Sequence, residues 1–368
     1  MNTTADTRNQ NHAEMIAGQT VSKLKQDMLA GRPGQGCHKC YSQEATGIES
    51  LRDLYNLETA RFLDHARLSE PNYENRTWYD LSLSNKCNQK CRICGLYNST
   101  SWKKDADAIS DLEWSHVNWK SMDSVLTDSS TAVSDILSSM QTATSAFKIE
   151  LKGGEPLYME SSKQLLSGMI KLGLHEKTEE LRIITNGTQH DADLISLLKM
   201  FPNINMAISV DATGKLHEYV RGTNMSWDEC RRSWLEIAAL PNITRLRISN
   251  TIYAYTIFDL ANLREWVLRE FGNKTSMADA MLDTPKYLHT KIVPQHLRDL
   301  AVSLLPPDYH MSAVIAAAPT PAEFYKTSDL DETVLLMRER FKTYTTRLDQ
   351  LRDENLLDVV PELAEMMR

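Results

Sequence analysis

The feature that most constrains the fold is an alternation of strand-like and helix-like segments through the middle of the chain. Short apolar runs are separated by longer segments in which apolar residues recur at helical spacing. Strands that alternate with helices form a parallel sheet, and right-handed crossovers curl such a sheet into a barrel. The expected strands are 78–83, 147–151, 181–185, 204–210, 245–252 and 287–292, and the expected helices between them are 130–140, 160–172, 191–200, 227–239 and 259–271.

Six strands are too few to close an eight-stranded barrel. The predicted fold is therefore α/β, a partial (β/α)6 TIM-like barrel with helical appendages at both ends. We expect an N-terminal helical region over 1–76, the barrel over 77–294 and a C-terminal helical tail over 295–368. The N-terminal region should contain a helix over 42–68. The tail is rich in Leu, Glu, Arg and Met and lacks Gly, and it either packs against the barrel or docks a partner.

Three cysteines follow the first expected strand at the spacing C-x3-C-x2-C, namely Cys87, Cys91 and Cys94. Their thiolates can converge on one inorganic cluster, and the next cysteine along the chain is the distant Cys230. A cubane iron–sulfur cluster held by three cysteines leaves one iron open, which catalysis at a metal requires. A zinc site with a His or Asp as fourth ligand, or unligated thiols in a reducing compartment, are the alternatives.

A second motif, Gly153-Gly154-Glu155-Pro156, lies between the expected strand 147–151 and the helix that follows it. Two glycines let the backbone approach a ligand closely. The carboxylate of Glu155 can accept hydrogen bonds from a cationic amine.

The third and fourth strands also end in polar residues. Asn186 follows the third strand, and Ser209 and Asp211 lie at the end of the fourth. Functional groups of α/β barrels lie on the loops after the carboxyl ends of strands. We therefore expect these residues, the cysteines and the Gly-Gly motif to meet at one mouth, although Ser209 and Asp211 can also be read as a strand-end turn or a helix cap.

At these residues the chain resembles the radical S-adenosylmethionine (radical SAM) superfamily, over roughly residues 78–294. Its CxxxCxxC and GGEP motifs are matched, and its TNG, SxD and "eyiRg" elements resemble the segments containing Asn186, Asp211 and Arg221. The resemblance implies a [4Fe-4S] cluster on Cys87, Cys91 and Cys94, and S-adenosylmethionine (SAM) bound by Gly153, Gly154, Glu155, Pro156, Asn186, Ser209, Asp211 and Arg221.

The resemblance also implies an activity. The cluster, reduced by a low-potential flavodoxin-like donor, cleaves SAM to a 5′-deoxyadenosyl radical that abstracts hydrogen from a substrate. Whether SAM is consumed or regenerated stays open. The nearest likeness is to SPASM/twitch-related proteins, which suggests a peptide or protein substrate. The alternative is a non-catalytic regulatory protein that binds zinc or a cluster.

A separate CxxC pair, Cys37 and Cys40, resembles a stretch that precedes the barrel in SPASM/twitch-related proteins. Relatives complete an auxiliary cluster there with further cysteines, but only Cys230 remains in this chain, so four thiolates cannot be supplied. The pair is a possible auxiliary iron–sulfur or zinc half-site with His38 as the nearest other ligand, or two reduced thiols.

Composition excludes several classes of function. The net charge of −8 argues against a general nucleic-acid or anionic-membrane binder, because both need clustered Lys and Arg. The chain has no apolar run long enough to span a membrane, and its polar start lacks the apolar core of a signal peptide. Six cysteines, mostly grouped at ligand spacing, suit a reducing compartment, so we expect a cytoplasmic protein.

Overall fold

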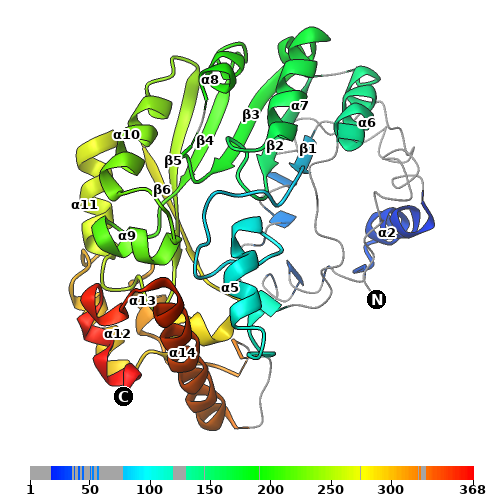
Figure 1. Ribbon diagram of the computed structural model, residues 1–368. Helices are drawn as coiled ribbons and strands as arrows, with labels where there is room; N and C mark the ends of the chain where they lie inside the picture. Colours follow the sequence, from blue (N-terminus) through cyan, green and yellow to red (C-terminus); the bar gives the residue numbers. More distant parts are fainter. Residues whose placement is uncertain are drawn as a thin grey trace.

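A computed structural model describes much of the chain, and its centre is a six-stranded parallel sheet in the order β1-β2-β3-β4-β5-β6 (Figure 1). The described residues are 18–34, 37, 40, 41, 44, 50, 52, 53, 56, 57, 78–118, 130–144, 146–189, 191–273, 275–321, 323, 324 and 329–368. The strands are β1 (Trp78–Ser82), β2 (Phe147–Lys152), β3 (Thr178–Thr185), β4 (Ile204–Ser209), β5 (Ile243–Ile252) and β6 (Ser276–Met281). Sequential parallel pairing with β1 and β6 at the edges confirms the partial (β/α)6 barrel.

Helices connect the strands and extend the fold at both ends. The α-helices are α2 (Gln19–Leu29), α5 (Lys103–Ala108), α6 (Ser130–Gln141), α7 (Glu160–Lys171), α8 (Ala192–Leu198), α9 (Gly214–Arg221), α10 (Trp227–Ala238), α11 (Leu260–Phe271), α12 (Gln295–Ser303), α13 (Ser312–Ala316) and α14 (Leu330–Arg352). Short 3-10 helices are η4 (Thr100–Trp102), η5 (His116–Asn118), η6 (Leu174–Lys177), η7 (Lys286–Leu288), η8 (Thr290–Ile292), η9 (Leu356–Asp358) and η10 (Pro361–Met367).

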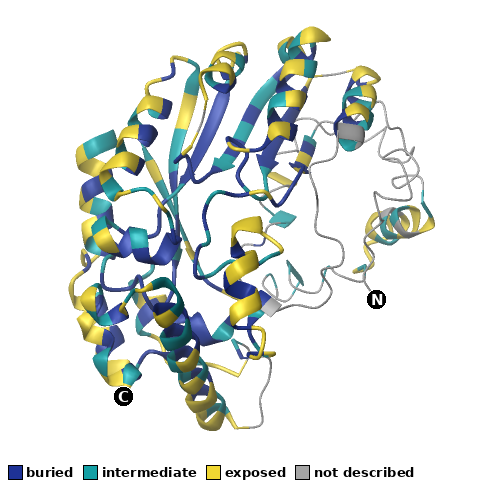
Figure 2. Cartoon of the chain, viewed as in Figure 1, coloured by how far each residue is buried: buried dark blue, intermediate teal, exposed yellow. Residues whose placement is uncertain are grey.

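Strand alternation separates an apolar face of the sheet from a polar one. Ile183 in β3 and Met206 in β4 belong to the apolar core that also contains Trp234 of α10. On the other face, Arg182 is in register with Glu150 of β2 and Asn205 of β4. Figure 2 shows buried strands between helices whose outward faces are exposed. The helices therefore cover the apolar face, as the alternating pattern requires.

The sixth strand is not where the sequence placed it. The expected strand 287–292 forms the two 3-10 helices η7 and η8, and β6 lies earlier, at Ser276–Met281. Its Ser, Ala and Asp residues give a weak strand signal. Tyr287 and Leu288 are buried because η7 packs against α14, so their apolar character reflects burial by the C-terminal helices.

The C-terminal tail is helical as expected, but its last part forms η9 and η10 rather than an α-helix. The long helix α14 contacts α5, η7 and η8, and Figure 1 shows α14 and α5 side by side. The expected helix 42–68 falls almost wholly outside the described residues. Among the described helices, none is both long and apolar enough to cross a membrane.

Candidate functional site

The three predicted cysteines lie on the loop that leaves β1, which we call the cysteine loop (residues 84–96). Cys87 and Cys91 are buried and Cys94 is half-buried, and the thiols of Cys91 and Cys94 are hydrogen-bonded to each other. Within the described residues, no three His, Cys, Asp or Glu side chains are grouped closely enough to hold a single metal ion.

The three thiols differ in how readily they lose a proton. Burial raises the pKa of Cys87 to about 12. The hydrogen bond from Cys94 lowers the pKa of Cys91 to about 7, helped by the positive charge of Arg221, whereas the same hydrogen bond raises the pKa of Cys94. One thiolate therefore forms easily, and the other two need a positive partner such as a metal before they deprotonate.

The backbone of the cysteine loop is fixed by side chains that come from distant parts of the sequence. Its carbonyl oxygens accept hydrogen bonds as follows: Lys90 from Arg352 at 2.9 Å, Cys91 from the Trp102 indole at 3.1 Å, Arg92 from the Tyr344 hydroxyl at 2.8 Å, and Cys94 from His116 at 2.9 Å. Burial lowers the pKa of His116 to about 4, so its ring is neutral and its Nε2 donates. These four carbonyl groups of a loop without strand or helix pairing are thereby satisfied.

The Gly-Gly motif after β2 packs directly on the cysteine loop. Gly153 and Gly154 have φ of +77° and +51°, a region that L side chains rarely adopt. A Cβ on Gly154 would lie 2.5 Å from the carbonyl oxygen of Lys86, and the backbone N–H of Glu155 donates to that same oxygen at 2.9 Å. Glycine is required here because two backbones approach each other.

Glu155 links the motif to the end of β3. It is fully buried beside Pro156, which is also buried, and burial raises its pKa to about 7. One carboxylate oxygen accepts from the N–H of Asn186 at 2.6 Å, and the other accepts from the hydroxyl of Thr185 and the N–H of Leu157. Both oxygens therefore bind the protein itself, which ties the ends of β2 and β3 together.

Asn186 continues this chain of contacts to the cysteines. Its side-chain N–H group donates to Asn88 at 2.9 Å and to the sulfur of Cys87 at 3.8 Å. Its side-chain oxygen accepts from Thr188. The TNG element thus reaches the cysteine loop.

The residues after β4 approach the cysteines from another side. Asp211 is buried, forms an ion pair with Arg221 at 3.0 Å and accepts the N–H of Thr251 at 2.8 Å. Arg221, at the end of α9, also donates to the sulfur of Cys91 at 3.9 Å. Ser209 is the half-buried last residue of β4, in register with Ser249 of β5.

Several buried polar atoms near these residues have no hydrogen-bond partner within the described part of the chain. They are the side-chain nitrogen of Gln89, Nε of Arg221 and the hydroxyl of Tyr253. Tyr253 directly follows β5, and burial together with the negative charge of Asp211 raises its pKa well above the usual range. An unpartnered buried polar group is costly, so these atoms fit a polar ligand at this mouth.

Sequence reasoning missed Tyr253 and the side chains that hold the loop carbonyls. The position of Tyr253 after a strand end was an available signal. No local sequence pattern marks Trp102, His116 or Tyr344 as residues that bind the loop carbonyls.

The other cysteines lie elsewhere. Cys37 and Cys40 are half-buried, and the backbone N–H of Tyr41 donates to the carbonyl of Cys37. His38 lies outside the described residues. Cys230 lies in α10 within the apolar core on the helix side of the sheet.

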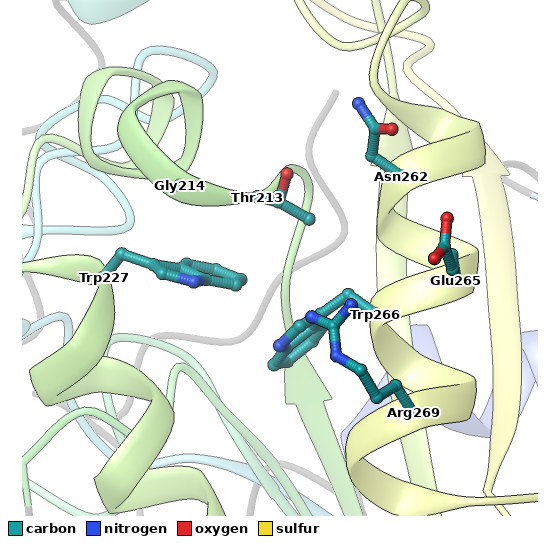
Figure 3. A pocket seen from close by; sticks show the side chains of 7 residues that line it. All are labelled: Thr213, Gly214, Trp227, Asn262, Glu265, Trp266 and Arg269. Carbon is teal, nitrogen blue, oxygen red and sulfur yellow. The ribbon is translucent and has the colours of Figure 1, made fainter.

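A surface pocket of about 280 Å³ lies between α9, α10 and α11 (Figure 3). Its walls include the indole rings of Trp227 and Trp266, and it is bordered by Thr213, Glu265 and Arg269. None of its lining residues was predicted as a site residue.

Comparisons with known proteins give no family model and no curated protein that matches the chain. Solved structures resemble it only loosely. The structure of anSMEcpe with bound AdoMet has a TM-score of 0.43 at 14% identity, covering 61% of this chain and 58% of that one. Streptococcus suis SuiB bound to S-adenosylmethionine has a TM-score of 0.43 at 14% identity, covering 84% of this chain and 64% of that one. SuiB bound to precursor peptide SuiA has a TM-score of 0.36 at 16% identity, covering 96% of this chain and 66% of that one.

The chain thus spans less than two thirds of the length of anSMEcpe and of SuiB bound to S-adenosylmethionine. At these scores the likenesses carry no weight for the function of this chain.

Proposed function

We propose that the chain is a radical SAM enzyme in which Cys87, Cys91 and Cys94 hold a [4Fe-4S] cluster. The observation that carries this proposal is the meeting of the motifs at one mouth. The cysteine loop is contacted by the Gly-Gly motif through Lys86 and by Asn186 through the sulfur of Cys87.

The donor set suits such a cluster. Three N–H groups point at the cysteine sulfurs, from the backbone of Gln89 at 3.4 Å and from the side chains of Asn186 and Arg221. Hydrogen bonds to sulfur stabilise and tune iron–sulfur centres. A cubane binds each cysteine through a different iron, so its three ligands need not surround one ion.

For SAM, we propose that the site consists of Gly153, Gly154, Glu155, Pro156, Asn186, Ser209, Asp211 and Arg221, together with Tyr253. The bound cluster supplies the electron that cleaves SAM to methionine and a 5′-deoxyadenosyl radical, which abstracts hydrogen from the substrate. The protein itself orients SAM and shields the radical from water. The backbone N–H of Glu155 holds the Gly-Gly motif against the cysteine loop, and its carboxylate binds the end of β3. The unpartnered donors of Arg221 and Tyr253 are available to polar groups of SAM.

We further propose a peptide or protein substrate and a low-potential, flavodoxin-like electron donor, following the resemblance to SPASM/twitch-related proteins. The polar face of the sheet, with Lys152 paired to Asp80 at 2.6 Å and Arg182 paired to Glu150 at 3.3 Å, suits a polar substrate. Cys37 and Cys40 remain a proposed auxiliary metal half-site.

Anoxic reconstitution of the full chain tests the proposal. We expect a brown protein with about four irons per chain that converts SAM to 5′-deoxyadenosine and methionine when dithionite is added. Cys91→Ala should abolish cluster binding and cleavage. Cys230→Ala, which removes a thiol from the distant core, should preserve both.

Two outcomes would contradict the proposal. A colourless protein that binds zinc would support the non-catalytic alternative. A cluster already ligated by four protein side chains would leave no iron for SAM.

A further inference from the structure

Arg92 lies between two of the predicted ligands, yet its side chain points away from them into the C-terminal helices. Its guanidinium is completely buried and pairs with Asp349 at 2.6 Å and Glu354 at 2.5 Å. It also stacks on the ring of Tyr219 at 3.6 Å from the centroid. The Tyr219 hydroxyl donates to Asp349 at 2.8 Å, so the cation, the carboxylates and the ring form one network.

Two further side chains of α14 hold the same segment of the loop. Tyr344 donates to the carbonyl of Arg92 and Arg352 donates to the carbonyl of Lys90. Arg352 also pairs with Asp105 at 2.8 Å and stacks on Trp102 at 4.8 Å. Because Trp102 donates to the carbonyl of Cys91, α14 reaches three successive residues of the loop, directly or through one intermediate.

The end of α14 is shaped for this contact. Asp353 has φ of +54°, the one non-glycine residue with positive φ in the described chain. This left-handed residue ends the helix and reverses the chain, which brings Glu354 back to Arg92. The N–H groups of Glu354 and Leu356 then bond to Asp349, one to its carbonyl and one to its carboxylate.

We propose that four side chains at the end of α14 and in the turn after it form a clamp that holds the cysteine loop in its ligand-presenting conformation, with Arg92 as the positioning residue. The clamp residues are Tyr344, Asp349, Arg352 and Glu354. The C-terminal helices are then part of the cysteine site. The role of the clamp rests on the proposed function, because holding residues 90–94 fixes the positions of Cys91 and Cys94, two of the three proposed cluster ligands.

Charge and geometry distinguish this clamp from ordinary packing. A buried ion pair contributes little to stability compared with apolar packing, and its best-supported use is to specify one arrangement. Here one guanidinium meets two carboxylates, a backbone carbonyl of Tyr219 and an aromatic face. Lysine could keep the charge at this position but could not provide the planar fork and the stacking.

The first test uses the full-length, cluster-free chain. Thiol alkylation by iodoacetamide, resolved by peptide mass spectrometry, reports how often the loop opens. We expect Cys91 and Cys94 to react about tenfold faster or more in Arg92→Lys and Asp349→Asn than in the wild type, because each change breaks the buried network. The matched control is Arg347→Lys, also on α14, whose exposed pair with Asp111 at 2.8 Å does not touch the loop. It should react at the wild-type rate.

The second test uses the reconstituted protein. Arg92→Lys should lose iron faster to a chelator and should change the electron paramagnetic resonance signal of the reduced cluster, whereas Arg347→Lys should match the wild type. If Arg92→Lys and Asp349→Asn fail to fold, Glu354→Gln, at the more exposed partner of Arg92, should show the same changes at smaller size.

The clamp is refuted if Arg92→Lys and Asp349→Asn show the same thiol reactivity as the wild type. Where these two variants do not fold, the same result in Glu354→Gln refutes it. It is also refuted if Arg347→Lys speeds alkylation equally. Alkylation of the cluster-free chain does not depend on cluster chemistry. A chain that binds no cluster but shows the predicted reactivities would overturn the proposed function and leave the clamp standing.

Discussion

The cysteine loop is held between two walls of different origin. The strand-end wall consists of Gly153–Glu155 and Thr185–Gly187, and it contacts the loop through the backbone N–H of Glu155 and the side chain of Asn186. The C-terminal wall consists of residues 344–356 and contacts the loop through long side chains, such as Arg352 and Tyr344. At Gly154 the strand-end wall depends on the absence of a side chain, whereas the C-terminal wall depends on long side chains.

This difference decides what sequence can reveal. Close backbone approach requires glycine, so the strand-end wall leaves a short motif that can be read. The C-terminal wall uses ordinary Arg, Tyr and Asp residues, and Arg92 and Asp349 are 257 positions apart. Nothing local in the sequence of α14 distinguishes these residues from those on an exposed helix.

The largest expected effect is a break in the strand-end wall. Gly154→Ala places a Cβ 2.5 Å from the Lys86 carbonyl oxygen at a positive φ, so backbone must move. We expect a loss of about 3 kcal/mol of unfolding free energy, measured by chemical denaturation. Gly173→Ala is the control, since its φ is +70° but its Cβ meets nothing within 4 Å. It should cost about 1 kcal/mol. Equal losses would show that the two backbones do not need to meet at Gly154.

Deleting one hydroxyl from each wall compares them directly. Thr185→Val removes the donor to the buried carboxylate of Glu155 and the acceptor of the Gly187 N–H, whereas Tyr344→Phe removes only the donor to the Arg92 carbonyl. We expect losses of about 2 and about 1 kcal/mol respectively, because Thr185→Val removes two buried hydrogen bonds and Tyr344→Phe removes one. Denaturation midpoints of the cluster-free chain measure both. A larger loss in Tyr344→Phe would reverse the ranking of the walls.

Acid should affect the strand-end wall and the contact of His116 with the loop in opposite directions. Burial raises the pKa of Glu155 to about 7, so its wall gains stability as the pH falls from 7 toward 4.5. Burial lowers the pKa of His116, which holds Cys94 beside the C-terminal wall, to about 4, so that contact loses stability as the pH falls from 6.5 toward 4. Each group should change the stability of its own contact by about 1 kcal/mol per pH unit.

Hydrogen exchange of the cluster-free chain between pH 7 and 5, corrected for intrinsic rates, measures this response. Protection should fall at the amides near Cys94 and rise or hold at the amide of Asn186. Parallel changes in both would contradict the opposed response.

Sequence predicted the sheet well because its strands alternate cleanly and end in recognisable motifs. The exception, β6, has short polar and small residues at a sheet edge. The apolar residues Tyr287, Leu288 and Ile292, which suggested a strand, lie in η7 and η8, which pack against α14. At the site, spacing located the cysteines and the Gly-Gly motif. It could not show that the Glu155 carboxylate faces Thr185 and Asn186, because that depends on how two strand ends meet.

The smallest expected effect concerns the turn that completes the C-terminal wall. Asp353 has φ of +54°, a conformation that costs an L residue energy which glycine avoids. Asp353→Gly should therefore raise the unfolding free energy by about 0.5 kcal/mol while keeping Glu354 at Arg92. Asp353→Ala is the control, and it should lower stability by a similar amount because alanine tolerates this region less well than aspartate. Thermal unfolding of the three proteins measures the order Gly, Asp, Ala, and any other order would mean that the turn does not require the left-handed conformation at residue 353.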